Sequence, residues 1–233
     1  MLELRRVSSG YGRAQVLFDF ELALGAGEAL ALLGRNGAGK SSVLKTIMGL
    51  LHGWSGKILW QGKEIQRLQT YQISRLGVGY VPEERRIFTG LTVLENLEAG
   101  RQPARAGAPT WTPARALELF PALGRMQARR GGSLSGGEQQ MLAIARTLMG
   151  NPKVVLLDEP FEGLGPLIVE AVAQAIRELR REGLSVLLCE QNLRFARRIA
   201  DRALIIEQGR RRYEGSLAAL EADAALRERY LAL

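Results

Sequence analysis

Residues 34–41 combine glycines, a lysine and a serine at the spacing of a phosphate-binding loop. They read Gly34-Arg35-Asn36-Gly37-Ala38-Gly39-Lys40-Ser41, a full GxxxxGK[ST] motif. The glycines let successive backbone N–H groups curl around phosphate oxygens, while lysine supplies a cation and serine a hydroxyl that ligates Mg²⁺. The motif predicts a site for a nucleoside triphosphate with Mg²⁺, and we expect Ser42 to contact the nucleotide as well.

Two carboxylates follow an apolar run at residues 154–157. Val154–Leu157 predicts a buried strand, and Asp158 and Glu159 come directly after it. A strand of this kind places Asp158 at the carboxyl edge of the sheet, beside the phosphate-binding loop. We therefore expect Asp158 to hold Mg²⁺ together with Ser41, and Glu159 to orient or deprotonate the attacking water.

A second glycine pair stands in Leu134-Ser135-Gly136-Gly137-Glu138-Gln139-Gln140. Ser135 and Glu138 have the spacing of a capping box, so an ordinary helix start is the simpler interpretation. The two glycines, however, permit close approach of a ligand to a helix N-terminus, where anions bind favourably. Because the first loop already surrounds one side of the phosphates, we expect Ser135, Gly136 and Gly137 to cover the nucleotide of a second subunit.

Composition and length set the limits for these motifs. The 233 residues are 46% hydrophobic and 24% charged, which suits one substantial globular core in one or two domains. The net charge of +8 is carried mainly by arginine in scattered pairs, so a solvated basic surface is favoured over a membrane or nucleic-acid contact. The single cysteine, Cys189, excludes an internal disulfide and is expected in a buried strand.

The chain shows no signal peptide and no apolar run near the roughly 18–20 residues that span a bilayer. We therefore expect a cytosolic chain unless another subunit holds it at a membrane.

Short apolar runs alternate with helical patterns, which predicts an α/β fold with a largely parallel sheet. The expected elements are the strands Ala29–Leu33, Val186–Cys189 and Leu204–Ile206, the antiparallel strands Leu2–Val7 and Lys57–Trp60, and the helices Ser42–Leu50, Leu167–Arg181 and Leu217–Leu233. Residues from about 91 to 150 have a helical character, interrupted by a loop at Arg101–Pro113.

The order of these motifs resembles the nucleotide-binding subunits of ABC transporters, and the resemblance covers essentially the whole chain. It implies one nucleotide-binding domain over residues 1–233. This domain would consist of a P-loop NTPase (RecA-like) core, an antiparallel β subdomain and an inserted helical subdomain at about 91–150, which carries the family's signature motif at Leu134–Gln140. It further implies that Tyr11 stacks on adenine, although an exposed turn is a real alternative, and that Gly163-Leu164-Gly165 is the D-loop.

Two positions depart from the general family pattern. Glu83, in Val81-Pro82-Glu83, stands where the Q-loop glutamine is usual, and Gln191 stands where the switch histidine is usual. Val-Pro-Glu and Glu-Gln-Asn at these places resemble the importers of branched-chain amino acids. Other short runs resemble the related urea and short-amide importers. Gln191 can hydrogen-bond a phosphate but carries no titrating proton. His52 is expected at the surface without a role.

The resemblance implies an ATPase that uses ATP and Mg²⁺ to energise an importer for hydrophobic amino acids. Its partners would be a second ATPase subunit (a copy or a paralogue) in an ATP-sandwich dimer, transmembrane permease subunits on the cytoplasmic side of the membrane and, indirectly, an extracytoplasmic solute-binding protein. Nucleic acid is not an expected partner. The alternatives are a urea or short-amide importer subunit, a non-transport ABC ATPase, or a regulatory module that holds ATP without hydrolysing it. Lys40, Asp158 and Glu159 argue against the last.

Overall fold

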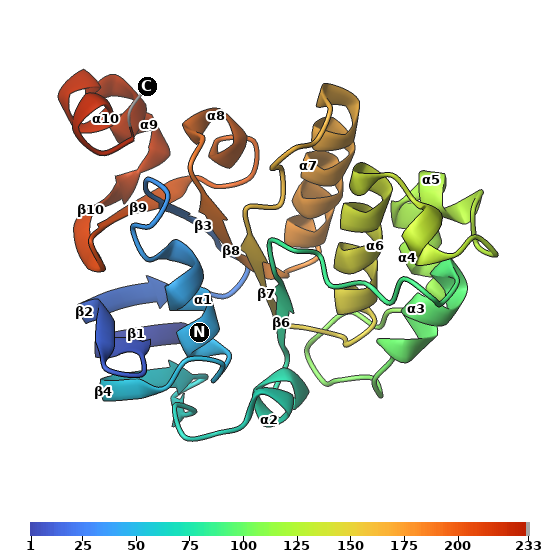
Figure 1. The fold of residues 1–233 in the computed structure, drawn as a ribbon, viewed down its shortest axis with the longest axis horizontal. Helices are drawn as coiled ribbons and strands as arrows, with labels where there is room; N and C mark the ends of the chain where they lie inside the picture. The colour runs from blue at the N-terminus through green and yellow to red at the C-terminus, as the bar shows by residue number, and fades with distance from the viewer. Residues whose placement is uncertain (232–233) are drawn as a thin grey trace.

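Two β-sheets and a surrounding set of helices make up the computed structural model, which describes residues 1–231 (Figure 1). The larger sheet has the strand order β10-β9-β3-β8-β7-β6, and its strands from β9 to β6 run parallel to their neighbours. Their bounds are β3 (Ala29–Leu33), β6 (Val78–Val81), β7 (Val154–Asp158), β8 (Ser185–Glu190), β9 (Arg202–Glu207) and β10 (Arg210–Ser216). The predicted α/β fold with a largely parallel sheet is confirmed.

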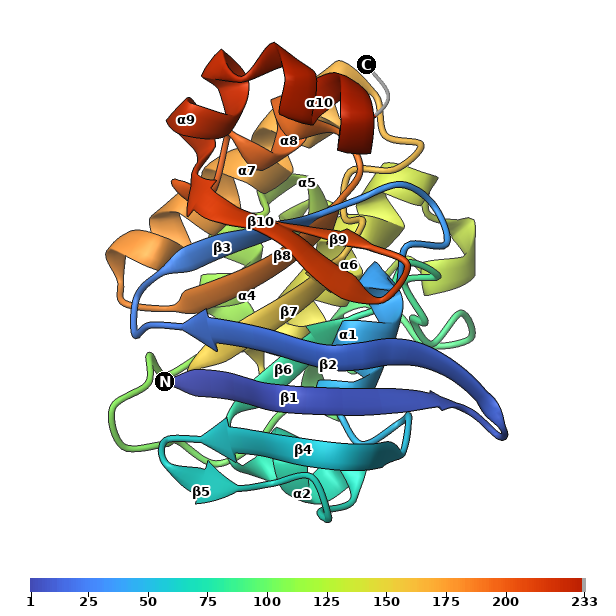
Figure 2. The ribbon, with the colours of Figure 1, turned by 90° about the vertical axis from the view of Figure 1, so that its left-hand side faces the viewer.

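The smaller sheet is antiparallel, with the order β2-β1-β4-β5 (Figure 2). Its strands are β1 (Leu2–Tyr11), β2 (Ala14–Leu24), β4 (Gly53–Trp60) and β5 (Lys63–Glu64). The two strands predicted here from residues 2–7 and 57–60 are therefore confirmed. The turn between β1 and β2 brings Tyr11 to one end of this sheet.

The helices occupy the connections between strands. They are α1 (Lys40–Ile47), α2 (Thr70–Arg75), α3 (Val93–Ala99), α4 (Pro113–Leu119), α5 (Pro121–Gly124), α6 (Gly136–Leu148), α7 (Pro166–Arg181), α8 (Leu193–Ala196), α9 (Leu217–Ala222) and α10 (Ala224–Leu231). The elements between residues 91 and 150 are all helical, and a single 3₁₀ turn (Gly131–Ser133) precedes α6. None of the helices in residues 1–231 is both long enough and apolar enough to span a membrane.

The prediction of a single helix at Leu217–Leu233 is wrong. The segment breaks into α9 and α10 at Asp223, whose φ of −92° and ψ of 94° are extended. The Asp223 carboxylate accepts a hydrogen bond from the Leu226 backbone N–H at 2.9 Å, as an N-cap does. An aspartate therefore ends one helix and begins the next, and residues 232–233 of the predicted helix lie outside the described part of the chain.

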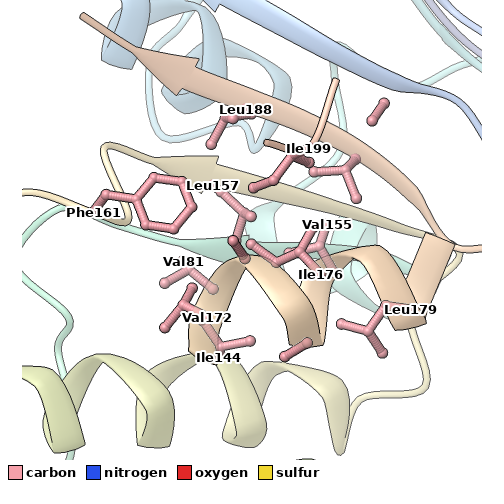
Figure 3. Close-up of a cluster of buried hydrophobic side chains, with 14 of the residues drawn as sticks. Val81, Ile144, Val155, Leu157, Phe161, Val172, Ile176, Leu179, Leu188 and Ile199 are labelled. Atoms are coloured by element: carbon pink, nitrogen blue, oxygen red, sulfur yellow. The ribbon is translucent and has the colours of Figure 1, made fainter. Parts of the chain in front are cut away.

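The parallel strands are buried on both faces, and side chains alternate between two cores. Ala31 and Leu33 of β3 belong to the core that packs against α6 and α7, while Leu30 and Leu32 belong to the core beneath α1 and the small sheet. Figure 3 shows the first core, where Ile144 of α6 and Val172 and Ile176 of α7 meet the sheet. This packing fixes the carboxyl ends of β3, β7 and β8 beside one another.

Candidate functional site

The phosphate-binding loop connects the carboxyl end of β3 to the first residue of α1, Lys40. Gly39 has a φ of 111°, in the left-handed region that favours glycine. Gly34 allows a close approach, because a Cβ there would lie 2.5 Å from the backbone oxygen of Ile206. The loop therefore needs glycine for its shape, and it presents the start of α1 to the space above the sheet.

Lys40, which is buried, and Glu159, which is partly buried, form an ion pair in the site. The Lys40 Nζ atom lies 3.0 Å from the Glu159 Oε1 atom, and the two side chains are 3% and 13% exposed. The same ammonium group donates to the backbone oxygens of Gly34 at 2.9 Å and Arg35 at 3.2 Å. Glu159 has a φ of 44°, so its backbone is held in a conformation that residues other than glycine rarely adopt. The structure thus brings the predicted lysine and glutamate together.

Asp158 lies beneath this pair and is 1% exposed. Its carboxylate accepts hydrogen bonds from the Ser41 hydroxyl at 2.9 Å and from the Tyr80 hydroxyl at 3.2 Å. Burial raises the pKa of Asp158, while these two hydrogen bonds act in the opposite direction. The Ser41 hydroxyl oxygen and the Asp158 carboxylate oxygen therefore lie side by side, and hard oxygen ligands of this kind suit Mg²⁺.

A cavity of about 420 Å³ opens above the phosphate-binding loop. Among its lining residues are nine that the sequence singled out: Tyr11, Asn36, Gly37, Gly39, Lys40, Ser41, Ser42, Glu83 and Glu159. Tyr11 is 49% exposed at its edge. Gly34, Arg35, Ala38 and Asp158 help to form the loop and floor but are not part of the lining. Glu83 reaches the cavity, whereas its neighbour Glu84 does not, which favours Glu83 at the Q-loop position.

Sequence reasoning missed Glu162 and Val16, which also line this cavity. Glu162 stands three residues after Glu159, and that spacing alone was the available signal. Glu83 faces Glu162 and Glu159 here, and its pKa is raised first by burial and then by these carboxylates. The site therefore concentrates negative charge opposite Lys40.

The capping box predicted at Ser135 begins α6. The Ser135 backbone N–H donates to the Glu138 carboxylate at 2.7 Å, and the Glu138 N–H donates to the Ser135 hydroxyl at 3.4 Å. Both glycines are packed closely: a Cβ on Gly136 would lie 2.8 Å from Arg85 Nη1, and one on Gly137 would lie 2.8 Å from Ile168 Cγ2. Ser135, Gly136 and Gly137 do not line the cavity of about 420 Å³. The structure does not bring the signature to this chain's own phosphate-binding loop.

Gln191 lines a different, adjoining cavity of about 300 Å³. This second cavity shares Glu159 and Glu162 with the first and adds Glu190 and Asn192. Gln191 is therefore placed beside Glu159 rather than above the loop. Asn192 caps α8, because its side-chain oxygen accepts a hydrogen bond from the Arg194 N–H at 2.9 Å.

Glu190 is a buried acid that sequence reasoning passed over. It is 3% exposed, and burial, followed by the nearby Glu159 charge, raises its pKa to about 8. Its position at the end of an apolar strand offered a weak signal, since acidic residues often end strands.

The raised pKa predicts a pH-dependent stability. Folded Glu190 keeps its proton up to about pH 8, whereas the unfolded side chain loses it near pH 4.5. The contribution of Glu190 to the free energy of unfolding is therefore complete below pH 4.5 and is lost as the pH rises to about 8. The free energy of unfolding of Glu190→Gln is to be compared with that of the parent protein at each pH. Between pH 4 and pH 8, the difference should shift in favour of the variant by roughly 3–5 kcal/mol.

Denaturant unfolding of both proteins at several pH values measures this difference. Glu178→Gln, at an exposed carboxylate, is the matched control and should show little change. An equal gap between Glu190→Gln and the parent protein at pH 4 and pH 8 would contradict the prediction.

Comparisons with known proteins assign the family. Residues 17–162, more than half of the chain, match the family model for ABC transporter. The chain is 43% identical to the high-affinity branched-chain amino acid transport ATP-binding protein BraG of Pseudomonas aeruginosa, with 99% of both chains covered. It is 36% identical to the probable branched-chain amino acid transport ATP-binding protein LivF of Archaeoglobus fulgidus, covering 93% of this chain and 92% of that protein.

Similarity extends to a different transport system and to a solved dimer. The chain is 34% identical to the lipopolysaccharide export system ATP-binding protein LptB of Escherichia coli, covering 99% of this chain and 96% of that protein. A dimeric structure of the ATP-binding cassette MJ0796, in a post-hydrolysis state with bound ADP and phosphate, is similar with a TM-score of 0.80 at 25% identity, covering 93% and 99% of the two chains. The predicted resemblance is confirmed, and the chain belongs to the ABC transporter family as an ATP-binding, ATP-hydrolysing subunit.

Proposed function

We propose that this chain energises an importer of branched-chain amino acids from the cytoplasmic face of the membrane. The observation that carries the proposal is the full-length similarity to BraG at 43% identity. Val81-Pro82-Glu83 and Glu190-Gln191-Asn192, which resemble the same branch, support it. Permease subunits hold the chain at the membrane, and an extracytoplasmic binding protein delivers the solute.

The nucleotide binds in the cavity above the phosphate-binding loop. Backbone N–H groups of residues 34–42 surround the phosphates, and Lys40 leaves Glu159 to reach the β- and γ-phosphates. Tyr11 at the rim stacks on adenine. Glu159 then faces the γ-phosphate as the group that orients or deprotonates water. Glu83 and Gln191 approach the same phosphate from the Q-loop and the switch position.

Ser41 and Asp158 hold Mg²⁺ in this proposal, since their oxygens already meet at 2.9 Å. When bound, the ion neutralises the charge that develops on the phosphate oxygens. Asp158, which is buried and fixed by Tyr80, supplies an acceptor that cannot move far.

Each hydrolytic site is built by two subunits. The signature residues Ser135, Gly136 and Gly137 do not line this chain's own cavity, so the N-terminus of α6 is free to face the nucleotide of a partner. The partner's signature covers the cavity of this chain in return. ATP binding closes the pair, and hydrolysis with product release opens it.

The permease docks in a groove of about 640 Å³ beside α2, where residues of α2, β6, α3 and α6 form its lining. The groove exposes two large apolar side chains, Tyr71 (59%) and Phe88 (50%). Arg146 of α6 lies over the Phe88 ring at 4.7 Å from its centroid, which holds the ring at the groove edge. Apolar side chains rimmed by polar groups suit a cytoplasmic segment of the permease.

Replacing Phe88 with serine should reduce solute import by about tenfold or more, because it removes a large exposed apolar side chain from the docking surface. ATP binding by the isolated chain should stay unchanged, since Phe88 does not line the nucleotide cavity. Uptake by membrane vesicles and nucleotide titration measure the two effects. Trp54→Ser, at an exposed aromatic residue outside the groove, is the control. Unchanged import in Phe88→Ser vesicles would contradict this docking surface.

Purification of the tagged chain from membranes, followed by identification of the attached subunits, tests the proposal. Reconstituted with those subunits, the chain should support ATP-dependent uptake of leucine, isoleucine or valine. Uptake of urea or short amides instead would support the related importer, whereas recovery without permease subunits would contradict a transport role.

A further inference from the structure

Glu190 ends β8 inside the protein, next to the site described above. Its Oε1 atom is buried and has no hydrogen-bond partner within residues 1–231. Glu190 lines the cavity of about 300 Å³ together with Glu159 and Gln191. A buried carboxyl oxygen without a partner is costly, so its position beside Glu159 calls for a physical explanation.

Two charged groups and two backbone donors surround Glu190. Lys40 approaches from the phosphate-binding loop and Glu159 from the turn after β7, and the backbone N–H groups of Gln191 and Asn192 donate hydrogen bonds to the Glu190 carboxyl group and lower its pKa. The Cys189 thiol is its neighbour on β8. Cys189 is fully buried, which raises its pKa and keeps the thiol neutral. Lys40 is already bonded to Glu159 at 3.0 Å. The Lys40 charge lowers the pKa of Glu190, but burial and the Glu159 charge raise it by more, because two ionised carboxylates that share a buried site repel each other.

We propose that Glu190 is a positioning residue for Glu159: it stays protonated while Glu159 is an anion, and its hydroxyl donates a hydrogen bond to Glu159 once Lys40 turns to the phosphates. This inference rests on the proposed roles of Lys40 and Glu159. No proton leaves Glu190 in this step; only the hydrogen-bond partner of Glu159 changes. A neutral donor steadies the Glu159 carboxylate without neutralising its charge, so Glu159 keeps its ability to accept a proton.

Two replacements separate this role from packing and from charge. Glutamine has the shape of a protonated glutamate and keeps a donor, whereas methionine has similar bulk and no donor. Glu190→Gln should keep kcat within about threefold near pH 7 and remove the loss of kcat that ionised Glu190 causes in the parent protein at alkaline pH. Below pH 8, Glu190→Met should have a kcat about tenfold lower than the parent protein, with KM for ATP little changed, and it should show no further loss of kcat at alkaline pH.

A direct readout of the proton needs no hydrolysis. In the nucleotide-free protein labelled with ¹³C at glutamate carboxyls, one resonance should titrate near pH 8 and be missing from Glu190→Gln. Titration of that resonance below pH 5 would overturn the proposal. So would a Glu190→Met variant with the kcat of the parent protein, or a Glu190→Gln variant as impaired as Glu190→Met.

Failure of the underlying proposal gives a different result. Glu159→Gln tests the role of Glu159 itself, and normal hydrolysis by that variant would remove the basis for both proposals. Loss of hydrolysis in Glu159→Gln, together with parental kcat and pH profile in Glu190→Met, would overturn the role of Glu190 alone.

Discussion

Replacing Glu159 with glutamine should lower ATP hydrolysis by about a hundredfold to ten-thousandfold, the range of a general base, while ATP still binds. The amide keeps the shape of the side chain but cannot accept a proton from water. It also removes the ion pair with Lys40, which lies 3.0 Å away, so the lysine is released toward the phosphates. The variant should therefore accumulate as a closed dimer with ATP between the subunits.

Single-turnover hydrolysis and light scattering with and without ATP measure both effects. Glu84→Gln is the matched control, because Glu84 is the neighbour of Glu83 that stays outside the nucleotide cavity. Hydrolysis by Glu159→Gln at the rate of the parent protein would show that Glu159 has been given the wrong role.

Replacing Ser135 with phenylalanine should lower the rate of ATP hydrolysis to below about one hundredth of the parent rate. Enzymes that lose one oxyanion-hole donor show an effect of this size. The bulky ring would obstruct the N-terminus of α6, which we propose to face the nucleotide of the partner. The change also removes a helix cap, at a cost of about 1 kcal/mol. The effect of the lost cap on stability must therefore be distinguished from the effect of the obstructed helix N-terminus on hydrolysis.

Thr92→Ala provides that separation. Thr92 begins α3 with the same capping box, accepting a hydrogen bond from the Glu95 N–H at 3.2 Å. Its removal should cost similar stability and leave hydrolysis within a few-fold of the parent. Thermal unfolding and steady-state ATPase assays give both quantities. Full activity in Ser135→Phe, or equal loss in Thr92→Ala, would argue against a role of the signature in catalysis.

The motifs with backbone requirements could be predicted from the sequence. Gly34 and Gly39 must be glycine because of close approach and positive φ, and a loop of that shape connects a strand to a helix. The same holds for Asp158, since an apolar strand in a parallel sheet ends at the common edge. Nine predicted residues line one cavity, two of them (Tyr11 and Glu83) predicted from the family resemblance alone, and the roles of all nine in binding and catalysis stay predictions.

Features that depend on tertiary packing could not be predicted. The raised pKa of Glu190 depends on its burial and on the charge of Glu159, which lies far away in the sequence. Arg85 packs against Gly136, and this approach requires the loop after β6 to fold toward α6. The prediction of a single C-terminal helix missed the break at Asp223 for the opposite reason. The local signal was present, since an aspartate can cap a helix, but it stood within an otherwise uniform helical composition.

We propose that hydrolysis needs two chains, each supplying half of every site. ATP turnover per chain should be measured over a range of protein concentrations, with the molecular mass determined in the same samples, for the chain alone and with the second ATPase subunit of its transporter. We predict that turnover rises with the fraction of paired chains and disappears in Ser135→Phe. A strictly monomeric species that hydrolyses ATP at full rate, unaffected by Ser135→Phe, would contradict the account.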